Sequence, residues 1–492
     1  MTPESSAPTH FYDVAIIGGG ISGLATAYYL QRHAAQNNRP CRYTLIERSP
    51  TGGGKILTEQ VHGFGDTPFI VEGGPDSFIS QKPWALQLAR EIGLQDSFLG
   101  TNDDRRKTFV LQNGKPTPLP DGVLLIVPTR FSPFILSPLI SPLGKLRMGL
   151  DFLIPARKDD EDETLADFVR RRLGDEALDK IAEPLLSGIY NSDAEKQSLL
   201  ATFPRFRDIE KKHGSLIRGM LSSRAHGPAK PAQAAQPTTP PAKPLSAFVS
   251  FRNGASQLVD TLVPKLTGDL RFNTGLCEIK QISDAAGARY TLSLSDGTKI
   301  AARHVVLATP AFVSAELLKH LAPDASTRLA AIRYVSTGTV SFGYVRSEVK
   351  HPLNGFGVVI PRSERRPINA ITWSSTKFDN RAPAGHALIR VFFGGSRNPE
   401  IMARSDEDIL DIARGELKAI MGVDATPVFH RLYRWRNATP QYDVGHLKHV
   451  DAIEAALPDG VFVTGSPYRG IGIPDCVHQA QLTADLLWQQ MT

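Results

Sequence analysis

The segment at residues 14–30 restricts the fold of this chain more than any other. It consists of an apolar run, a glycine-rich turn and a second apolar stretch, the pattern of a strand followed by a helix. Gly18, Gly20 and Gly23 have the spacing G-x-G-x-x-G, which makes a tight turn and leaves room for a pyrophosphate beside the backbone. The free N–H groups at the start of the helix would then face the phosphates.

A second strand, at residues 43–46, ends at Glu47. A carboxylate roughly 20 to 25 residues beyond the last motif glycine accepts hydrogen bonds from an adenosine ribose with a free 2′-hydroxyl. Glycines also gather in ordinary turns, so the motif alone is weak evidence. Here strand, turn, helix, second strand and acid agree, and the sequence predicts a dinucleotide-binding site.

Composition bounds the remaining classes. A chain of 492 residues with 22% charged and 41% hydrophobic residues is typical of a large globular protein with more than one domain. The formal charge of +6 favours an anionic partner, which could be an acidic substrate, a nucleic acid or a membrane surface. No basic run is interleaved with aromatic residues, so we expect no nucleic-acid partner.

The N-terminal ten residues have neither an apolar core nor an arginine-rich pattern, which favours the cytoplasm. Cys41, Cys277 and Cys476 are isolated, so we expect free thiols and no metal site. The apolar region 123–155 is interrupted by prolines and is not a spanning helix. We expect its apolar side chains to line a pocket or core wall, with a peripheral membrane contact as the alternative; they are Phe131, Phe134, Ile135, Leu136, Leu139 and Ile140.

The rest of the chain alternates strands and helices. We expect a hairpin at Asn113-Gly114, and a helix that starts at Thr164 and ends at Pro184. Strands are expected at 270–282 and 290–307, and a further sheet at 335–393. A last strand near 461–465 leads through a glycine loop into a helix with Pro474 in its first turn.

The glycine cluster at 52–54, followed by Lys55, resembles the second glycine signature of flavin amine oxidases and porphyrinogen oxidases, which favours FAD over NAD. The segments 74–78 with Lys82, 185–190 and 470–476 resemble, in the same order, the soluble bacterial type of porphyrinogen oxidase in the heme pathway. An ordinary Gly-Pro-Asp turn is the alternative reading of residues 74–78.

The resemblance implies an α/β fold with a discontinuous, Rossmann-like FAD-binding domain, a mixed-sheet substrate domain and a helical lobe. The FAD-binding domain would comprise 10–90, 248–315 and 437–492, and the substrate-binding domain 316–436. The helical lobe, 91–221, would line the substrate cavity, and 222–247 would be a proline- and alanine-rich flexible loop.

The same resemblance implies site residues. The expected FAD contacts are Gly18, Gly19, Gly20, Ile21, Ser22, Gly23, Glu47, Arg48, Lys55, Gly74, Pro75, Asp76, Ser77, Ile279, Trp435, Gly472, Ile473 and Pro474. The expected substrate contacts are Lys82, Gly188 and Tyr190, with Lys82 as a cation for a propionate or, alternatively, a solvated lysine before a helix. Arg105 and Arg106 are weaker candidates for the same role.

Three departures from the relatives affect these assignments. The relatives have an arginine before the two glycines, where this chain has Thr51, so Arg48 would have to supply a phosphate contact. Gly73 stands where the relatives have another arginine. Asn191 and Ser192 replace a small pair and would crowd a backbone expected near the substrate.

The implied reaction removes six electrons and six protons from a porphyrinogen in three rounds, and O₂ takes up each electron pair to give hydrogen peroxide. The flavin does this chemistry, so no catalytic acid–base residue is assigned. Coproporphyrinogen III is the expected substrate, and protoporphyrinogen IX and then an amine are the alternatives. A flavin-binding scaffold without turnover is a further alternative, and the next enzyme of the heme pathway is an expected transient partner.

Overall fold

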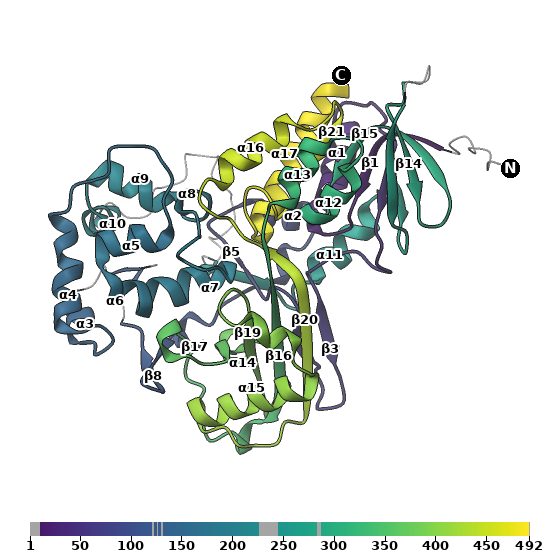
Figure 1. The fold of residues 1–492 in the computed structure, drawn as a ribbon. Coiled ribbons are helices and arrows are strands. Elements are labelled where there is room, and N and C mark those ends of the chain that lie inside the picture. Colours follow the sequence, from purple (N-terminus) through teal and green to yellow (C-terminus); the bar gives the residue numbers. More distant parts are fainter. Residues whose placement is uncertain are drawn as a thin grey trace, which may run out of the picture.

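The computed structural model describes residues 10–120, 123–124, 126–128, 131–225, 245–282 and 287–491. Two seven-stranded sheets and a lobe of helices make up the described protein. In Figure 1 the first sheet lies at the upper right with both termini, the second sheet lies below it, and the helical lobe extends to the left. The predicted loop 222–247 lies mostly outside the described residues.

The first sheet has the order β12-β2-β1-β15-β14-β13, and β21 pairs with β15. Its pairs among β12, β2, β1, β15 and β21 are parallel, whereas β15, β14 and β13 form an antiparallel meander. The strands are β1 (His10–Ile17), β2 (Tyr43–Ile46), β12 (Asp269–Arg271), β13 (Leu276–Gln281), β14 (Tyr290–Leu294), β15 (Lys299–Leu307) and β21 (Val461–Val463).

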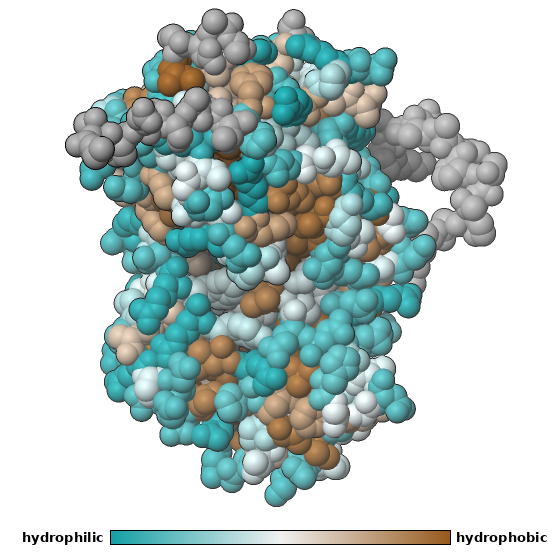
Figure 2. All heavy atoms as spheres, turned by 90° about the vertical axis from the view of Figure 1, so that its right-hand side faces the viewer, coloured by the Kyte–Doolittle hydropathy of each residue, from teal (hydrophilic) through white to brown (hydrophobic). Residues whose placement is uncertain are grey.

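Helices cover both faces of the first sheet because β1 is apolar on both. Val14 and Ile16 point into a core shared with α1 (Ile21–Gln36), α2 (Trp84–Glu91), α11 (Gln257–Leu262) and α17 (Ile473–Met491). Ala15 and Ile17 point into the opposite core, which contains α12 (Ala311–Leu318), α13 (Pro323–Ala330) and α16 (His446–Ala455). Such two-sided burial is typical of parallel sheets. On the face at the right of Figure 1, apolar residues form separate patches among polar ones (Figure 2).

The second sheet has the order β20-β16-β19-β18-β17-β7-β8. Helix α15 (Asp406–Met421) packs on one face, and the hairpin of β3 (Thr58–Val61) and β4 (Phe69–Glu72) contacts Leu388 on the other. The strands are β7 (Thr108–Gln112), β8 (Lys115–Pro118), β16 (Tyr334–Val345), β17 (Gly357–Val359), β18 (Ile368–Trp373), β19 (His386–Gly394) and β20 (Phe429–Pro440). The predicted hairpin at Asn113-Gly114 is confirmed, and its strand β7 pairs in parallel with β17.

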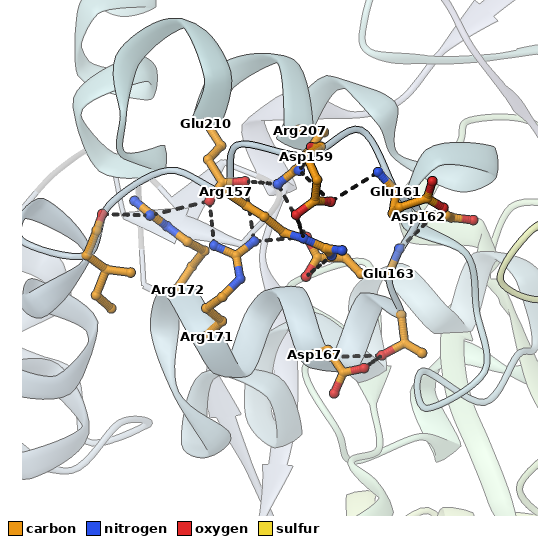
Figure 3. A network of polar contacts seen from close by, with 12 residues as sticks. Arg157, Asp159, Glu161, Asp162, Glu163, Asp167, Arg171, Arg172, Arg207 and Glu210 are labelled. Carbon is orange, nitrogen blue, oxygen red and sulfur yellow. Dashed lines mark hydrogen bonds and ion pairs between the residues drawn. The ribbon is translucent and has the colours of Figure 1, made fainter.

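The helical lobe runs from α3 (Phe131–Leu136) to α10 (Leu216–Ala225). Thr164 caps α5 (Leu165–Leu173) by accepting from the Asp167 N–H, as predicted. The predicted end at Pro184 is wrong, because a π-helix, η4 (Leu178–Ser187), continues through it. The wider i→i+5 pairing of a π-helix tolerates the missing proline N–H. Buried ion pairs among arginines and carboxylates join α5 to α9 (Pro204–His213) (Figure 3).

The prediction for the apolar region 123–155 is half right. Phe134, Leu139 and Ile140 are buried in the lobe, whereas Ile135 is 60% exposed and Leu136 is 83% exposed. Successive residues of a helix point in different directions, so α3 buries Phe134 and turns the next two side chains to solvent. Within the described ranges, no helix has the length and apolarity needed to cross a membrane.

Shorter elements complete the fold. The remaining strands are β5 (Phe78–Ile79), β6 (Phe98–Gly100), β9 (Val123–Leu124), β10 (Val127–Pro128) and β11 (Phe248–Phe251). The remaining α-helices are α4 (Pro142–Gly149), α6 (Asp175–Ala177), α7 (Gly188–Tyr190), α8 (Leu199–Thr202) and α14 (Ser374–Lys377). The 3₁₀ turns are η1 (Gln95–Ser97), η2 (Asp103–Arg105), η3 (Leu150–Phe152), η5 (Val263–Lys265), η6 (Arg346–Glu348), η7 (Arg362–Glu364) and η8 (Pro399–Ala403).

Candidate functional site

The turn between β1 and α1 leaves an open space where a pyrophosphate would need one. A Cβ atom at Gly18 would lie 2.8 Å from the carbonyl oxygen of Ala308, and one at Gly23 would lie 1.9 Å from that of Gly18. A Cβ atom at Gly20 would meet nothing within 4 Å. The first and third glycines are therefore needed for close packing, and the second borders free space, as a dinucleotide-binding turn requires.

The start of α1 is suited to an anion. Gly20 is its N-cap, no side chain caps the helix, and its first turn has no acidic residue. The N–H groups of Ile21 and Ser22 thus remain at a helix N-terminus, where the helix dipole favours negative charge. These residues fit the phosphates of a dinucleotide.

Glu47 lies directly beside this turn at the end of β2. Its carboxylate accepts from the Gly19 N–H at 2.6 Å and from the Ser49 N–H at 2.7 Å. Arg48 is exposed next to it. The Thr274 N–H donates to the Glu47 carbonyl, so the segment that leads into β13 passes beside Glu47. Ile279 is buried farther along β13.

The second glycine cluster packs onto the first. The Gly53 N–H donates to the Gly19 carbonyl at 2.8 Å. The Lys55 ammonium donates to the Ala438 carbonyl at 2.6 Å and to the Ser466 hydroxyl at 3.3 Å. Lys55 is exposed, yet burial lowers its pKa. A side chain that lines a hollow inside a protein is accessible to solvent and still surrounded by protein atoms. We therefore expect Lys55 to line a hollow beside the two glycine clusters.

The turn at 73–77, after β4, is held by the second sheet. Trp435 Nε1 donates to the Gly73 carbonyl at 2.7 Å, and Arg390 Nη2 donates to the Gly74 carbonyl at 2.7 Å. A Cβ atom at Gly74 would lie 1.8 Å from the carbonyl oxygen of Lys55, which shows how closely the turn packs on the glycine cluster. A Cβ atom at Gly73 would lie 3.0 Å from side chains on both sides, so this position has no room for the arginine of the relatives.

Asp76 in this turn is a half-buried anion. Lys377 Nζ lies 2.8 Å from one of its oxygens, and the Ser77 hydroxyl donates to the other at 2.6 Å. Burial alone would favour the neutral acid, but the charges of Lys377 and Arg390 hold the pKa of Asp76 well below its usual value. Pro75 lies between Gly74 and Asp76 in the same turn.

The last turn precedes α17 and completes the group. Gly472 precedes Ile473 and Pro474, which form the first helical residues, as predicted. The Gly470 N–H donates to the hydroxyl oxygen of Tyr442 at 2.8 Å, and that hydroxyl donates to the Ser466 carbonyl at 2.6 Å. Ser466 also contacts Lys55, so this turn and the second glycine cluster are joined.

Lys82 lies at this site but is paired. Its ammonium is 2.5 Å from a carboxylate oxygen of Asp475, which follows Pro474 in α17. Its side chain is 40% exposed, so the pair can still be reached from outside. Arg105 and Arg106 are exposed at η2, and the described contacts do not connect them to the turns.

Gly188 and Tyr190 lie where the helical lobe meets the C-terminal segment. A Cβ atom at Gly188 would meet nothing within 4 Å. The Tyr190 ring is buried against Phe203 and Tyr442, at centroid distances of 5.8 and 5.9 Å. Burial raises the pKa of Tyr190. Asn191 has a left-handed backbone and packs near Gly395, where an added Cβ atom would lie 3.1 Å from its own.

A cavity of about 410 Å³ lies elsewhere, between the helical lobe and η7. Its charged wall residues are largely paired, for example Arg170 with Glu195 and Arg362 with Asp193. None of the predicted site residues lines it. The open position at Gly20 and the uncapped start of α1 therefore remain the candidate cofactor site.

Sequence reasoning missed Arg390, Lys377 and Tyr442. Their roles depend on contacts with residues far away in the chain, and no local motif marks them. A charged residue within the apolar run of β19 is the only signal that could have singled out Arg390.

A largely parallel sheet covered on both faces, with a glycine turn at a helix start, defines a dinucleotide-binding domain, and a second mixed sheet accompanies it. The profile of the family described as flavin containing amine oxidoreductase matches residues 21–487. The chain belongs to this family. It is an FAD-dependent oxidase, and the predicted resemblance, fold class and cofactor are confirmed.

Individual relatives cover almost the whole chain. The coproporphyrinogen III oxidase of Bacillus subtilis (strain 168) is 36% identical over 471 residues, which are 95% of this chain and 96% of the relative. The chloroplastic protoporphyrinogen oxidase of Oryza sativa subsp. japonica is 31% identical, over 98% of this chain and 89% of the relative. A solved structure from Exiguobacterium sp. 255-15, assigned to the protoporphyrinogen oxidases, is 30% identical with a TM-score of 0.82, and covers 98% of this chain and 99% of that one.

Proposed function

We propose that this chain oxidises coproporphyrinogen III to coproporphyrin III and uses O₂ to give hydrogen peroxide. The observation that carries the proposal is the 36% identity to the Bacillus subtilis coproporphyrinogen III oxidase over 95% of the chain. The geometry of the turn between β1 and α1 supports it, because a Cβ atom at Gly20 would meet nothing within 4 Å and no side chain caps the start of α1. The balance is six electrons and six protons per porphyrin, passed to three O₂.

FAD supplies the redox chemistry, since its ring accepts a hydride. The chain binds and orients it. We propose that the N–H groups of 18–23 hold the pyrophosphate, Glu47 the ribose, and Ile279 the adenine side, with Arg48 as a phosphate contact. The residues proposed near the ring system are Lys55, Gly74, Pro75, Asp76, Ser77, Trp435, Gly472, Ile473 and Pro474.

The protein then acts by positioning. A bound porphyrinogen must bring one carbon to roughly 3 to 3.5 Å from the reacting atom, a geometry worth many powers of ten in rate. Gly188 and Tyr190 would contact the substrate at the helical lobe. No side chain is needed as a general base in this proposal, and none is assigned.

Lys82 is proposed to bind a substrate propionate. Its pairing with Asp475 would hold the ammonium in place, and the ammonium would then bind the substrate carboxylate as well as Asp475. Such a cation, and the net charge of +6, attract a substrate with four propionates more strongly than one with two.

The remaining partner assignments are also proposals. Exposed leucines of α3, α4 and η3 support a peripheral membrane contact, since Leu136, Leu143 and Leu146 face solvent. A cytoplasmic location and a transient contact with the next enzyme of the heme pathway are proposed from the resemblance alone. Protoporphyrinogen IX is the second candidate substrate, favoured by the plant relatives.

An aerobic assay tests the proposal. We expect coproporphyrin fluorescence to appear, with three molecules of hydrogen peroxide formed per molecule of porphyrin. Lys82→Glu should raise KM for coproporphyrinogen about tenfold, the effect of about 1.4 kcal/mol, whereas Lys448→Glu, at an exposed lysine paired with Glu161, should not change it. Peroxide formed from amines, with no porphyrin formed from either porphyrinogen, would contradict the proposal.

A further inference from the structure

The turn at 73–77 takes much of its support from the second sheet, and the Gly73 N–H also donates to the Leu57 carbonyl at 2.8 Å. The donors to the carbonyls of Gly73 and Gly74 come from β20 and β19, and the cation on Asp76 comes from α14. On its other side the turn packs on the backbone of Lys55. Any cofactor that touches this turn is therefore positioned by the second sheet.

Arg390 brings a positive charge to this turn in addition to a hydrogen bond. Its side chain is 3% exposed, and besides Gly74 it donates to the Thr339 hydroxyl at 3.3 Å. Its guanidinium lies 4.8 Å from the centre of the Phe392 ring, and its Nε has no hydrogen-bond partner. Trp435 shows that a neutral N–H suffices to hold a carbonyl of the turn.

The charge of Arg390 has no adjacent counter-ion. Among the described residues, no carboxylate oxygen lies within 4.0 Å of its guanidinium. Asp76 and Glu72 attract it from farther away, but Asp76 is already bonded to Lys377 and Ser77, and Glu72 accepts from Thr58 and Ala255. An arginine stays protonated even when buried, and a buried charge without a directly paired counter-ion is costly. The second sheet thus presents a fixed positive charge directly behind the turn.

The positive charge of Arg390 is opposite in sign to the charge that a flavin gains on reduction. Uptake of a hydride adds two electrons and one proton, so the ring system gains one negative charge. A fixed cation in a poorly solvated site stabilises the more negative form, and charge near the ring is a recognised means of tuning a flavin.

We propose that Arg390 is a positioning residue that holds the 73–77 turn and, by its buried charge, raises the reduction potential of the FAD bound there. The proposal rests on the proposed placement of FAD at this turn. It assigns to the second sheet a role in cofactor chemistry.

The test measures the potential of bound FAD by anaerobic reduction against a reference dye, without any porphyrinogen. Arg390→Met should move the potential to a more negative value, with at least a tenfold change in the equilibrium constant, about 30 mV for a two-electron couple. Arg390→Lys keeps the charge and should keep most of the potential. Lys377→Met leaves Asp76 uncompensated and should shift the potential in the same direction as Arg390→Met.

Arg381→Met is the matched control. Arg381 is equally buried and, like Arg390 and Asp76, lines a small cavity between β4 and the second sheet. It donates to Ser250, Phe251 and Arg252, and Glu72 lies 4.0 Å away. We expect a smaller shift there than for Arg390→Met. An equal shift would show that the effect does not act through the turn and would overturn the assignment.

A wild-type potential in Arg390→Met, with FAD bound, would also overturn the proposal. If that variant fails to fold or bind FAD, an unchanged potential in Lys377→Met overturns it instead. A negative shift in a protein that oxidises no porphyrinogen would leave the role of Arg390 intact and contradict only the proposed substrate.

Discussion

Gly20 and Gly23 lie three residues apart in one turn, but a side chain would have different consequences at the two positions. At Gly23 an added Cβ atom overlaps the Gly18 carbonyl, whereas at Gly20 it enters open space. The backbone of Gly20 is also extended, with φ −70° and ψ 174°, so alanine fits it. Close packing requires one glycine, and room for a ligand requires the other.

We therefore expect Gly23→Ala to lower the free energy of unfolding by about 3 kcal/mol or more. Gly20→Ala should change that of the FAD-free protein by at most about 1 kcal/mol, as for an N-cap substitution, and should weaken FAD binding at least about tenfold. Urea unfolding and FAD titration measure the two effects. Normal FAD affinity in Gly20→Ala would contradict the placement of the pyrophosphate.

Glu72 is a residue whose protonation should affect stability. It accepts from the Thr58 hydroxyl at 2.6 Å and from the Ala255 N–H at 2.9 Å, with Arg381 at 4.0 Å. Burial raises its pKa from 4.5 to about 7, although these donors and the charges of Arg381 and Arg390 act in the opposite direction. The folded protein therefore binds more protons than the unfolded chain between pH 4.5 and 7.

The sign follows from this difference. The stability contributed by the protonated Glu72 is present at low pH and is lost as the pH rises through 7, by up to about 3 kcal/mol. Glu72→Gln lacks this loss, so its melting temperature relative to wild type should rise between pH 5 and pH 8. Burial lowers the pKa of His304 and His446 to about 4, so their contribution to stability rises with pH. Wild type and Glu72→Gln both contain these histidines, so the difference between the two proteins does not depend on them. A constant difference between the two proteins would contradict the raised pKa.

At the scale of elements, the helical lobe depends on a buried charge network. Arg172 of α5 is fully buried and contacts the Asp151 carboxylate at 2.5 Å and that of Glu210 at 3.4 Å. It also donates to the carbonyls of Ile154 and Gly214. Figure 3 shows Arg172, Arg171 and Arg207 converging on Glu210. One side chain thereby joins α5, η3 and the end of α9.

Removing Arg172 would leave Asp151 buried without its cation. Breaking such a pair typically costs about 3 to 5 kcal/mol, and we expect that loss for Arg172→Met. Arg218→Met, at an exposed arginine that lies over the Phe152 ring, should cost less than about 1 kcal/mol. Helix content during urea unfolding reports both. Equal stabilities of the two variants would contradict the role of the network.

The elements that could be predicted are those with local signals. The glycine spacing placed β1, α1 and β2, and Thr164 with Asp167 marked the start of α5. The π-helix through Pro184 could not be predicted, because a proline normally ends a helix and only tertiary packing stabilises the wider turn. Likewise, the pairing of β7 with β17 joins segments that are far apart in the chain.

The site could be predicted only in part for the same reason. The backbone turns have motifs, but the side chains that hold them come from remote strands. Lys82 illustrates the limit, since its position at the site followed from the resemblance while its partner Asp475 did not.

At the scale of the whole molecule, the proposed cofactor connects segments from both ends of the chain. The turns at 18–23, 73–77 and 470–474 lie on different elements. Residues 53–55 link them, since they contact Gly19, Gly74 and Ser466, and Tyr442 joins Ser466 to Gly470. Ligand binding to the folded state alone adds about 2.7 kcal/mol at 100 times Kd. We expect added FAD to raise the melting temperature of the FAD-free protein, whereas NAD at the same concentration should not. An equal shift with NAD would contradict the cofactor assignment.

The central claim is that the bound flavin is reduced by a porphyrinogen, and most readily by coproporphyrinogen III. Anaerobic stopped-flow mixing of the FAD-loaded protein with each porphyrinogen, followed at the visible flavin band, tests it most directly. We expect both porphyrinogens to bleach the band, coproporphyrinogen III to do so faster, and Lys82→Glu to remove this preference. Bleaching by neither porphyrinogen, in a protein whose flavin an amine reduces, would contradict it.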